Sequence, residues 1–477
     1  MLLRLLYDDQ LAEAAYLIGC QRTGEAILID PERDIDRYLH AAASNGVRIT
    51  AIAETHIHAD FLSGARQLAE ATGATLYLSG AGGDDWQYGW LDQRSDGGTY
   101  DHVLLQEGDT FSVGNIRFQA MHTPGHTPEH LCYLVTDLGG GADDPMGVLS
   151  GDFVFVGDLG RPDLLETAAG VEGAREVGAR DLQRSAERFL ELPDHLQVWP
   201  AHGAGSSCGK SLGAVPQSTV GYERRHNAAL QLAGDADAFI EGILAGQGAP
   251  PLYFGRMKQL NRDGVPLLER LPSPAQYGPA ELAALDTRKT AVIDLRSWED
   301  FREGHLAGAL HLTRGPMLLA ACGSWIRPDE PVVLICQPLE VDQLTRGLVR
   351  IGVDNVEAWA SPASLDGILS AAAATTPQIG PDELEAMLSG GAALLDVRSS
   401  AEHAAVSIDG GTLIPHTRLL ERLDDVPGGD LLVMCAGGIR SAMACSMLER
   451  AGHVVTNLGG GMHGWQMHQR RLASSGG

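Results

Sequence analysis

Apolar residues in the first half of the chain come in short runs that end in polar residues. Glycine-rich turns bound these runs, which predicts β-strands with fewer helices between them. The predicted strands are AAYLIG (14–19), EAILID (25–30), ITAIAET (49–55), TLYLSG (75–80), IRFQAMHT (116–123), LCYLVT (131–136), GVLSGDFVF (147–155) and LQVWPAHG (196–203). Histidine and aspartate stand at the ends of several strands, so we expect polar side chains to gather there.

The second half of the chain contains two similar segments. AVIDLRSWEDFREGH at 291–305 resembles ALLDVRSSAEHAAV at 393–406, and Asp294 and Asp396 within them lie 102 positions apart. A repeat of this length matches a small domain rather than a solenoid unit. Each copy reads as helix, buried strand, loop, buried strand ending in cysteine, and helix, which predicts two α/β domains with parallel sheets.

These patterns divide the chain into four parts. Residues 1–258 form the strand-rich domain, and residues 259–277, which contain prolines and charges, form a linker. Residues 278–372 and 378–477 form the two repeated domains. The expected fold class is therefore α/β multidomain.

Composition and charge exclude several classes of protein. The chain has 477 residues and a formal charge of −27, which disfavours binding to nucleic acid or an anionic membrane. Arg4 and Asp8 interrupt the N-terminal apolar run, unlike a secretory signal, and no apolar stretch reaches the ~18 residues of a membrane span. Seven cysteines without CxxC pairs favour a reducing compartment, so we expect a cytoplasmic protein.

Metal-ligand residue types recur in four short elements of the first domain. These are HIHAD at 56–60, HTPGHTPEH at 122–130, GD at 151–152 and PAH at 200–202. Imidazole and carboxylate suit metals such as iron and zinc. A single histidine such as His130 is more readily a buried core residue, but the four elements together indicate a metal centre.

This combination of motifs resembles the metallo-β-lactamase superfamily over residues 1–258. The resemblance implies a four-layered αββα sandwich. Within the superfamily, thiolester hydrolases of the glyoxalase II type carry two metals, and persulfide dioxygenases carry one ferrous iron. Phe61 stands where the hydrolases have a histidine ligand to the second metal. This departure favours the branch with one iron.

The resemblance also implies roles for individual residues. The ligands of one Fe(II) per chain, for which Zn can substitute, would be His56, His126 and Asp152, leaving positions open for substrate and O₂. The residues that would orient these ligands and a bound water are His58, Asp60 and His202. Arg161 in GRPD would face the substrate, with a structural salt bridge as the alternative. Relatives that act on glutathione persulfide have a tyrosine just after PAH. This tyrosine is absent here, so the identity of the thiol in the persulfide substrate stays open.

The last repeat carries a cysteine loop, CAGGIRS at 435–441. Cys435 ends a buried strand before a helix, so backbone N–H groups, the helix N-terminus and Arg440 favour its thiolate. With Gly437 and Gly438, this Cys-x4-Arg loop resembles the rhodanese (thiosulfate sulfurtransferase) family. The resemblance implies that Cys435 carries a sulfane sulfur.

The middle repeat differs at the same loop, which reads CQPLEVD at 336–342. It has no glycine, Val341 replaces the arginine, and Glu340 and Asp342 add negative charge. These changes disfavour a thiolate at Cys336. We therefore expect the middle copy to be inactive in sulfur transfer.

Two other cysteines lie in the first domain. Cys208, six residues after His202, lies in HGAGSSCGK, which resembles three-domain fusions of a persulfide dioxygenase with two rhodanese domains. The resemblance implies that Cys208 acts with the iron site. For Cys20 we expect a packing role.

The resemblance to such fusions implies a coupled function. The iron centre would oxidise a low-molecular-weight persulfide with O₂ to sulfite and thiol, and the rhodanese domain would exchange sulfur with sulfite and thiosulfate. We also expect a homo-oligomer, a dimer or tetramer. Two alternatives stay open: a zinc-dependent thiolester hydrolase attached to rhodanese, and a non-catalytic sulfur carrier or sensor.

Overall fold

The computed structural model describes residues 1–167, 173–210 and 212–475. These fall into two compact units. One contains Met1–Arg270 and Arg350–Gly352, and the other contains Leu271–Val349 and Val353–Gly477. Among the described residues, no helix is long and apolar enough to cross a membrane.

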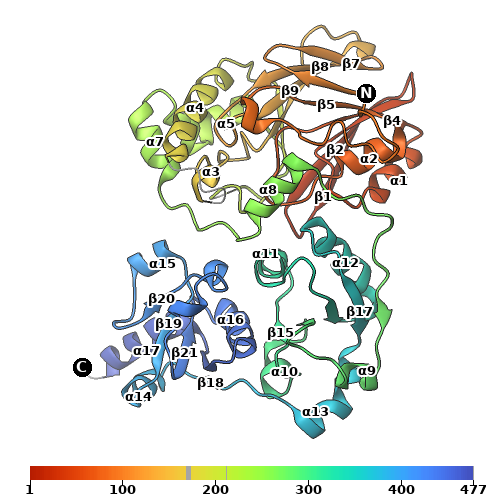
Figure 1. Ribbon diagram of the computed structural model, residues 1–477. Helices are drawn as coiled ribbons and strands as arrows, with labels where there is room; N and C mark the ends of the chain where they lie inside the picture. The colour runs from red at the N-terminus through yellow and green to blue at the C-terminus, as the bar shows by residue number, and fades with distance from the viewer. Residues whose placement is uncertain (168–172, 211, 476–477) are drawn as a thin grey trace. The chain divides into compact units, whose positions relative to one another are not determined.

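Two six-stranded sheets form the centre of the first unit (Figure 1). The first sheet has the strands, in order, β1 (Leu2–Asp8), β2 (Glu13–Cys20), β3 (Glu25–Ile29), β4 (Arg48–Ala53), β5 (Thr75–Ser79) and β6 (His102–Leu105). The second has, in order, β12 (Ser218–Thr219), β11 (Gln197–Pro200), β10 (Gly147–Gly151), β9 (Leu131–Asp137), β8 (Ile116–His122) and β7 (Thr110–Val113). The strands β3 to β6 run parallel, and β10 pairs in parallel with β11.

Buried side chains of both sheets pack against each other in one apolar cluster that includes Tyr16, Ile27, Phe118, Tyr133 and Trp199. The outer face of each sheet packs against helices in a further cluster. The helices of this unit are α1 (Asp36–Ser44), α2 (Ala65–Thr72), α3 (Leu164–Thr167), α4 (Ala174–Phe189), α5 (Val220–His226), α6 (Ala228–Gln231), α7 (Ala236–Leu244) and α8 (Phe254–Asp263). The expected αββα sandwich is confirmed.

The second unit contains two five-stranded parallel sheets with the same strand order. The middle copy has β13 (Ala275–Gln276), α9 (Pro279–Ala283), β14 (Ala291–Asp294), α10 (Trp298–Glu303), β15 (Leu310–His311), α11 (Pro316–Trp325), β16 (Val332–Ile335), α12 (Val341–Arg350), β17 (Val356–Ala360) and α13 (Asp366–Ala372). The last copy has β18 (Gln378–Ile379), α14 (Leu384–Ser389), β19 (Ala393–Asp396), α15 (Ser400–Ala405), β20 (Thr412–Leu413), β21 (Asp430–Met434), α16 (Ile439–Arg450), β22 (Val454–Leu458) and α17 (Gly461–Ser475). The prediction of α/β domains with parallel sheets is confirmed.

The segment 259–277, expected to be a linker, is partly ordered structure. Its first five residues complete α8, where the buried side chain of Asn261 donates hydrogen bonds to the carbonyls of His58 and Phe61. Its end includes β13, which pairs with β17. Asn261 in this segment thus holds the loop after β4.

Candidate metal centre and sulfur-transfer loops

Three buried donors meet at the ends of strands in the first unit. His56 lies after β4, His126 lies between β8 and β9, and Asp152 directly follows β10. One donor atom from each lies within 4.8 Å of the others, and all three residues are at most 2% exposed. Asp152 Oδ2 lies 3.4 Å from His126 Nε2 and 3.9 Å from His56 Nε2. The structure thus brings together the three predicted metal ligands.

The polar atoms at the centre of this cluster lack ordinary partners. Within the described part of the chain, His56 Nε2 and both carboxylate oxygens of Asp152 are buried without a hydrogen bond. Buried polar groups are rarely left in this state because their desolvation costs free energy. Two imidazoles and a carboxylate that face one another fit a divalent metal such as iron or zinc.

A hydrogen-bonded chain fixes the ring of His56. The Thr55 hydroxyl donates to Asp30 Oδ2 at 2.9 Å, so it accepts from His56 Nδ1, also at 2.9 Å. The backbone N–H of Thr55 donates to Asp30 Oδ1 at 2.7 Å. This arrangement places the proton on Nδ1 and leaves the Nε2 lone pair of His56 facing the cluster.

Different contacts fix the other two donors. His126 Nδ1 donates to the carbonyl of Arg161 at 3.0 Å, which frees Nε2. The backbone N–H of Asp152 donates to His130 Nε2 at 3.1 Å. Gly151 before it has φ +52°, and a Cβ there would lie 2.7 Å from His130 and Thr55. A residue with a side chain would not fit before Asp152, so position 151 requires glycine. His130 is a buried histidine with hydrogen-bond partners, in line with its expected core role.

Burial and charge set the protonation of the donors. Burial, with the nearby His58, lowers the pKa of His56 well below its usual range, and burial lowers the pKa of His126. Burial alone would raise the pKa of Asp152, but the charges of His202, His126 and His56 together hold it well below its usual range. Neutral imidazoles beside an ionised carboxylate are the forms that bind a metal.

A second donor cluster lies next to the first. It consists of Asp60, His202 and Cys208, whose donor atoms also lie within 4.8 Å of one another. His202 Nε2 is 3.2 Å from Asp60 Oδ2 and 3.4 Å from Asp152 Oδ1. The two oxygens of Asp152 therefore face different clusters. The sequence had placed Asp60 and His202 around the ligands and Cys208 near the centre, and the structure gathers all three.

His202 depends on two residues that the sequence did not single out. Its Nδ1 donates to the carbonyl of Ala12 at 3.0 Å and lies 3.1 Å from a carboxylate oxygen of Glu13. Glu13 is 1% exposed and is the first residue of β2, whose other residues are all buried. A charged residue inside an otherwise apolar run was the only signal that could have identified it.

Backbone strain coincides with these supports. Of the described non-glycine residues, only Ala12 and Asp30 have left-handed φ angles, +55° and +51°. Such conformations cost ~1–3 kcal/mol and persist where the surrounding structure enforces them. Ala12 supports His202 and Asp30 supports Thr55 and His58, so both strained residues hold the candidate centre.

His58 and Phe61 lie beside each other outside the donor clusters. His58 Nε2 is 3.1 Å from Asp30 Oδ1. Burial alone would lower the pKa of His58, but the charge and hydrogen bond of Asp30 and the charges of Glu54 and Asp60 together raise it to about 9. The Phe61 ring lies 4.4 Å from the His58 ring and is fully buried. Phe61 therefore packs against a histidine that supports the site.

Arg161 is held by an ion pair inside the first unit. It is 3% exposed, its guanidinium makes two hydrogen bonds to Asp163 at 2.8 and 2.6 Å, and it donates to the carbonyl of Gly248. The structure therefore contains the salt bridge that we gave as the alternative, which satisfies the guanidinium. A role of Arg161 in substrate binding stays a prediction.

A cavity of 440 Å³ reaches the second cluster from one side. His202 lines it together with Tyr7, Asp9, Pro200, Ala204 and Pro216. Its lining combines apolar groups with one carboxylate and one phenol. Of the six residues in the two donor clusters, His202 is the one that lines it.

In the cysteine loop of the last copy, two hydrogen-bond donors point at the sulfur of Cys435, whereas the guanidinium of Arg440 is bound to Glu402. Cys435 directly follows β21, and its Sγ accepts hydrogen bonds from the Gly438 N–H at 3.0 Å and the Ser441 hydroxyl at 3.5 Å. Gly438 has φ +104° and precedes α16, whereas Gly437 is exposed. Arg440 makes two hydrogen bonds to Glu402, at 2.7 and 2.6 Å. The guanidinium thus lowers the pKa of Glu402 to about 2.

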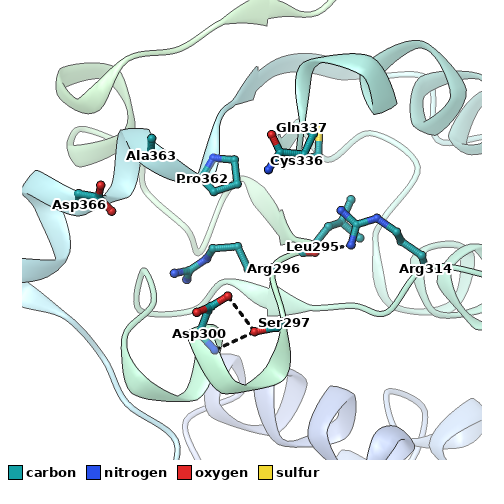
Figure 2. A pocket seen from close by; sticks show the side chains of 10 residues that line it. All are labelled: Leu295, Arg296, Ser297, Asp300, Arg314, Cys336, Gln337, Pro362, Ala363 and Asp366. Carbon is teal, nitrogen blue, oxygen red and sulfur yellow. Dashed lines mark hydrogen bonds between the residues drawn. The ribbon is translucent and has the colours of Figure 1, made fainter.

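The middle copy reverses this ion pair. Its loop residue Glu340 pairs with Arg314, which comes from outside the loop. Burial, with the charge of Glu340, raises the pKa of the Cys336 thiol to about 12. A cavity of 510 Å³ lies beside it, and Figure 2 shows Cys336, Arg296 and Arg314 around this space. A protonated thiol next to a carboxylate agrees with the prediction of an inactive copy.

Cys20 is buried in the apolar cluster between the two sheets, and its Sγ accepts a hydrogen bond from the Asn115 N–H at 3.3 Å. Burial would raise the pKa of the Cys20 thiol, but hydrogen bonds with Thr23, Asn115 and Arg22 together lower it to about 7. The packing role that we expect for Cys20 therefore stays a prediction.

Comparisons with known proteins agree with this architecture. A family model described as the metallo-beta-lactamase superfamily matches residues 8–202, and the rhodanese-like domain matches residues 279–357 and 380–468. The solved structure of a metallo-beta-lactamase from Staphylococcus aureus subsp. aureus COL is 40% identical, with a TM-score of 0.67; the match covers 76% of this chain and 99% of that chain.

Two curated relatives are each similar to part of the chain. A probable metallo-hydrolase of Burkholderia pseudomallei is 30% identical over 295 residues, 57% of this chain and 94% of that protein. The hydroxyacylglutathione hydrolase of Gloeobacter violaceus is 32% identical over 180 residues, 37% of this chain and 58% of that protein. The chain therefore belongs to the metallo-beta-lactamase superfamily, and it carries two rhodanese-like domains.

Proposed function

We propose that the chain is a persulfide dioxygenase that uses one Fe(II), coupled to a sulfurtransferase. The observation that carries this proposal is the cluster of two histidines and one carboxylate, His56, His126 and Asp152, with buried donor atoms that lack partners. The same chain holds a cysteine loop whose N–H and O–H groups point at sulfur. The first feature suits oxidation of the terminal sulfur of a persulfide, and the second suits transfer of a sulfane sulfur.

The protein groups have separate tasks at the first centre. A bound iron would supply redox chemistry with O₂ and leave coordination positions for the substrate. Thr55 and the Arg161 carbonyl hold the two imidazoles with their Nε2 atoms inward, and His130 holds the backbone of Asp152. The cavity beside His202 admits the substrate, and burial of the donors limits water.

The overall reaction balances with water as co-reactant. One persulfide RSSH, one O₂ and one H₂O give one thiol RSH and one sulfite with two protons. The terminal sulfur is oxidised by four electrons, which O₂ accepts. The S–S bond breaks, and the thiol leaves.

Sulfur transfer follows at Cys435. A persulfide on Cys435 gives its terminal sulfur to sulfite, so the Cys435 S–S bond breaks and a new S–S bond forms in thiosulfate. The cysteine leaves as thiolate, which the N–H of Gly438 and the hydroxyl of Ser441 stabilise. The opposite direction loads Cys435 from thiosulfate.

The experiment is anaerobic reconstitution of metal-free protein with Fe(II), followed by iron analysis and O₂ uptake with glutathione persulfide and with other persulfides. We expect about one iron per chain and one sulfite per O₂ consumed. The variant Asp152→Asn should lose iron and O₂ uptake together. Reconstituted protein that binds iron but consumes no O₂ with any persulfide would refute the proposal.

A metal-dependent thiolester hydrolase is the second candidate. The adjacent cluster of Asp60, His202 and Cys208 favours it, because hydrolysis benefits from two ions that share charge. Its relatives include the hydroxyacylglutathione hydrolase named above. Cleavage of a glutathione thiolester without O₂ uptake would identify this activity.

A further inference from the structure

A cavity of 250 Å³ lies inside the second unit, beside the loop that carries Cys435. Some of its lining residues belong to the last copy, including Gly437 and Gly438 of this loop, and others belong to the middle copy, including Trp298 and His311. We propose that this cavity binds a small primary ammonium compound against the sulfur-transfer loop. The inference goes beyond the proposed function, which gives this cavity no role.

Two buried polar side chains that line the cavity lack partners. His311 and Asn457 are each 1% exposed, and over the described ranges neither ring nitrogen of His311 nor Oδ1 of Asn457 makes a hydrogen bond. The side-chain nitrogen of Asn457 is already used, because it donates to Gln378 at 2.8 Å. Buried polar atoms are rarely left without a partner, since this costs free energy. A polar group that enters the cavity would satisfy them.

The chemistry of the lining defines the class of ligand. Asn457 Oδ1 is an acceptor, and burial lowers the pKa of His311 to about 4, so its neutral imidazole offers a second acceptor. Glu299 on α10 adds a carboxylate, and among the described residues no lysine or arginine lines the cavity. An ammonium group only donates hydrogen bonds and carries the charge that a carboxylate attracts. An anion would meet a carboxylate and no cation.

The remaining lining suits the carbon chain of such a compound. The indole N–H of Trp298 donates to Gln378 at 2.6 Å, which fixes this ring, and the ring centre lies 5.3 Å from that of His311. The face of an indole ring attracts cations. Ile439 and Ala442 also line the cavity and offer apolar contact.

A compound in this cavity would touch the loop without occupying the reacting sulfur. Gly438 lines the cavity, and its N–H donates to Cys435 Sγ at 3.0 Å, whereas Cys435 is not one of the described lining residues. Contact with Gly437 and Gly438 should restrict the motion of the loop. Exchange of the loop's amide hydrogens should therefore become slower when the cavity is filled.

The test uses the full chain and three probes with four-carbon chains, n-butylammonium, 1-butanol and butyrate. Binding is measured by titration calorimetry, and amide exchange by mass spectrometry of the peptide that contains residues 435–441. We expect about one butylammonium per chain, at least ~10-fold weaker binding of butanol, and no binding of butyrate. Bound butylammonium should slow exchange in this peptide. No binding of butylammonium, equal binding of butanol, binding of butyrate, or unchanged exchange would each overturn the inference.

Three variants locate the site. Glu299→Gln removes the charge of an exposed side chain and should weaken butylammonium binding by ~2–5-fold. His311→Phe keeps a ring without its nitrogens and should weaken binding by at least ~10-fold. Glu303→Gln is the matched control, because it removes the same charge from the same helix at an exposed position outside the lining.

The control variant should bind butylammonium as the parent protein does. An equal loss in Glu303→Gln and Glu299→Gln would show that the acidic surface, not the cavity, attracts the cation, and it would overturn the inference. Undiminished binding in His311→Phe would do the same. No measurement depends on O₂ uptake or sulfur transfer, so the result is separable from the proposed function.

Discussion

Thr55→Val tests whether the hydrogen bonds behind His56 position a metal ligand. Valine has nearly the shape of threonine but lacks the hydroxyl that joins His56 Nδ1 to Asp30 Oδ2, at 2.9 Å on each side. The variant leaves a buried imidazole N–H and a buried carboxylate oxygen without this partner. We expect the ring of His56 to lose its fixed orientation.

Two magnitudes follow from this loss. An unsatisfied buried polar group costs ~1–3 kcal/mol, so the metal-free variant should unfold at a lower temperature. Loss of a partner that orients a metal ligand typically weakens metal binding by ~10–100-fold. The assays are the dissociation constant for Fe(II), measured by competition with a chelator, and thermal unfolding of the metal-free protein.

Thr376→Val is the matched control. The buried Thr376 hydroxyl donates to Glu449 at 2.8 Å in the second unit, and neither residue contributes an atom to a donor cluster. This variant should lose stability by a similar amount but leave iron affinity unchanged. An iron dissociation constant for Thr55→Val within about twofold of the parent value would refute the reasoning. An equal loss of iron affinity in Thr376→Val would also refute it.

Four further substitutions separate the centres. Cys435→Ser should abolish thiosulfate sulfurtransferase activity and leave O₂ uptake with persulfide largely intact, because the loop and the donors lie in separate units; equal loss of both would contradict independent sites. Cys336→Ser should leave sulfur transfer nearly unchanged, since its thiol has a pKa of about 12, and a large drop would show an active middle copy. Cys208→Ser should lower persulfide oxidation more than iron content, and a parallel loss would assign it a structural role. Phe61→His should raise zinc stoichiometry and weak thiolester cleavage without improving O₂ uptake; faster persulfide oxidation in this variant would show that Phe61 is not an adaptation to one iron.

The sequence predicts the inner strands of the first unit and misses its borders. The four strands without a clear pattern, β1, β6, β7 and β12, are the outermost strands of the two sheets. Three of them expose several side chains, and β12 has only two residues. An edge strand has a neighbouring strand on one side only and exposes more of its side chains. The alternation of apolar and polar residues along it is therefore weak.

The candidate centre follows the same division. Residues that donate to a metal have distinctive types and spacings, and the structure gathers His56, His126 and Asp152 as predicted. The groups that hold these ligands in place have no distinctive type or spacing. A backbone carbonyl such as that of Ala12, or a single Glu13 in an apolar strand, belongs to no sequence motif. The partners that a side chain meets in the folded chain decide which arginine is free, as the ion pair of Arg161 with Asp163 and its hydrogen bond to the carbonyl of Gly248, 87 positions away, show.

The contact between His202 and Ala12 has a consequence for the order in which the chain is made. These residues are 190 positions apart. The carbonyl of the strained residue Ala12 therefore receives its hydrogen bond from His202 only after most of the first unit has left the ribosome. Cys208 follows six positions later. Non-local contacts of this kind close late in folding. The second donor cluster is therefore complete only after nearly all strands of the first unit have been synthesised, whereas His56, His126 and Asp152 all precede His202, so early metal loading would begin at the first cluster.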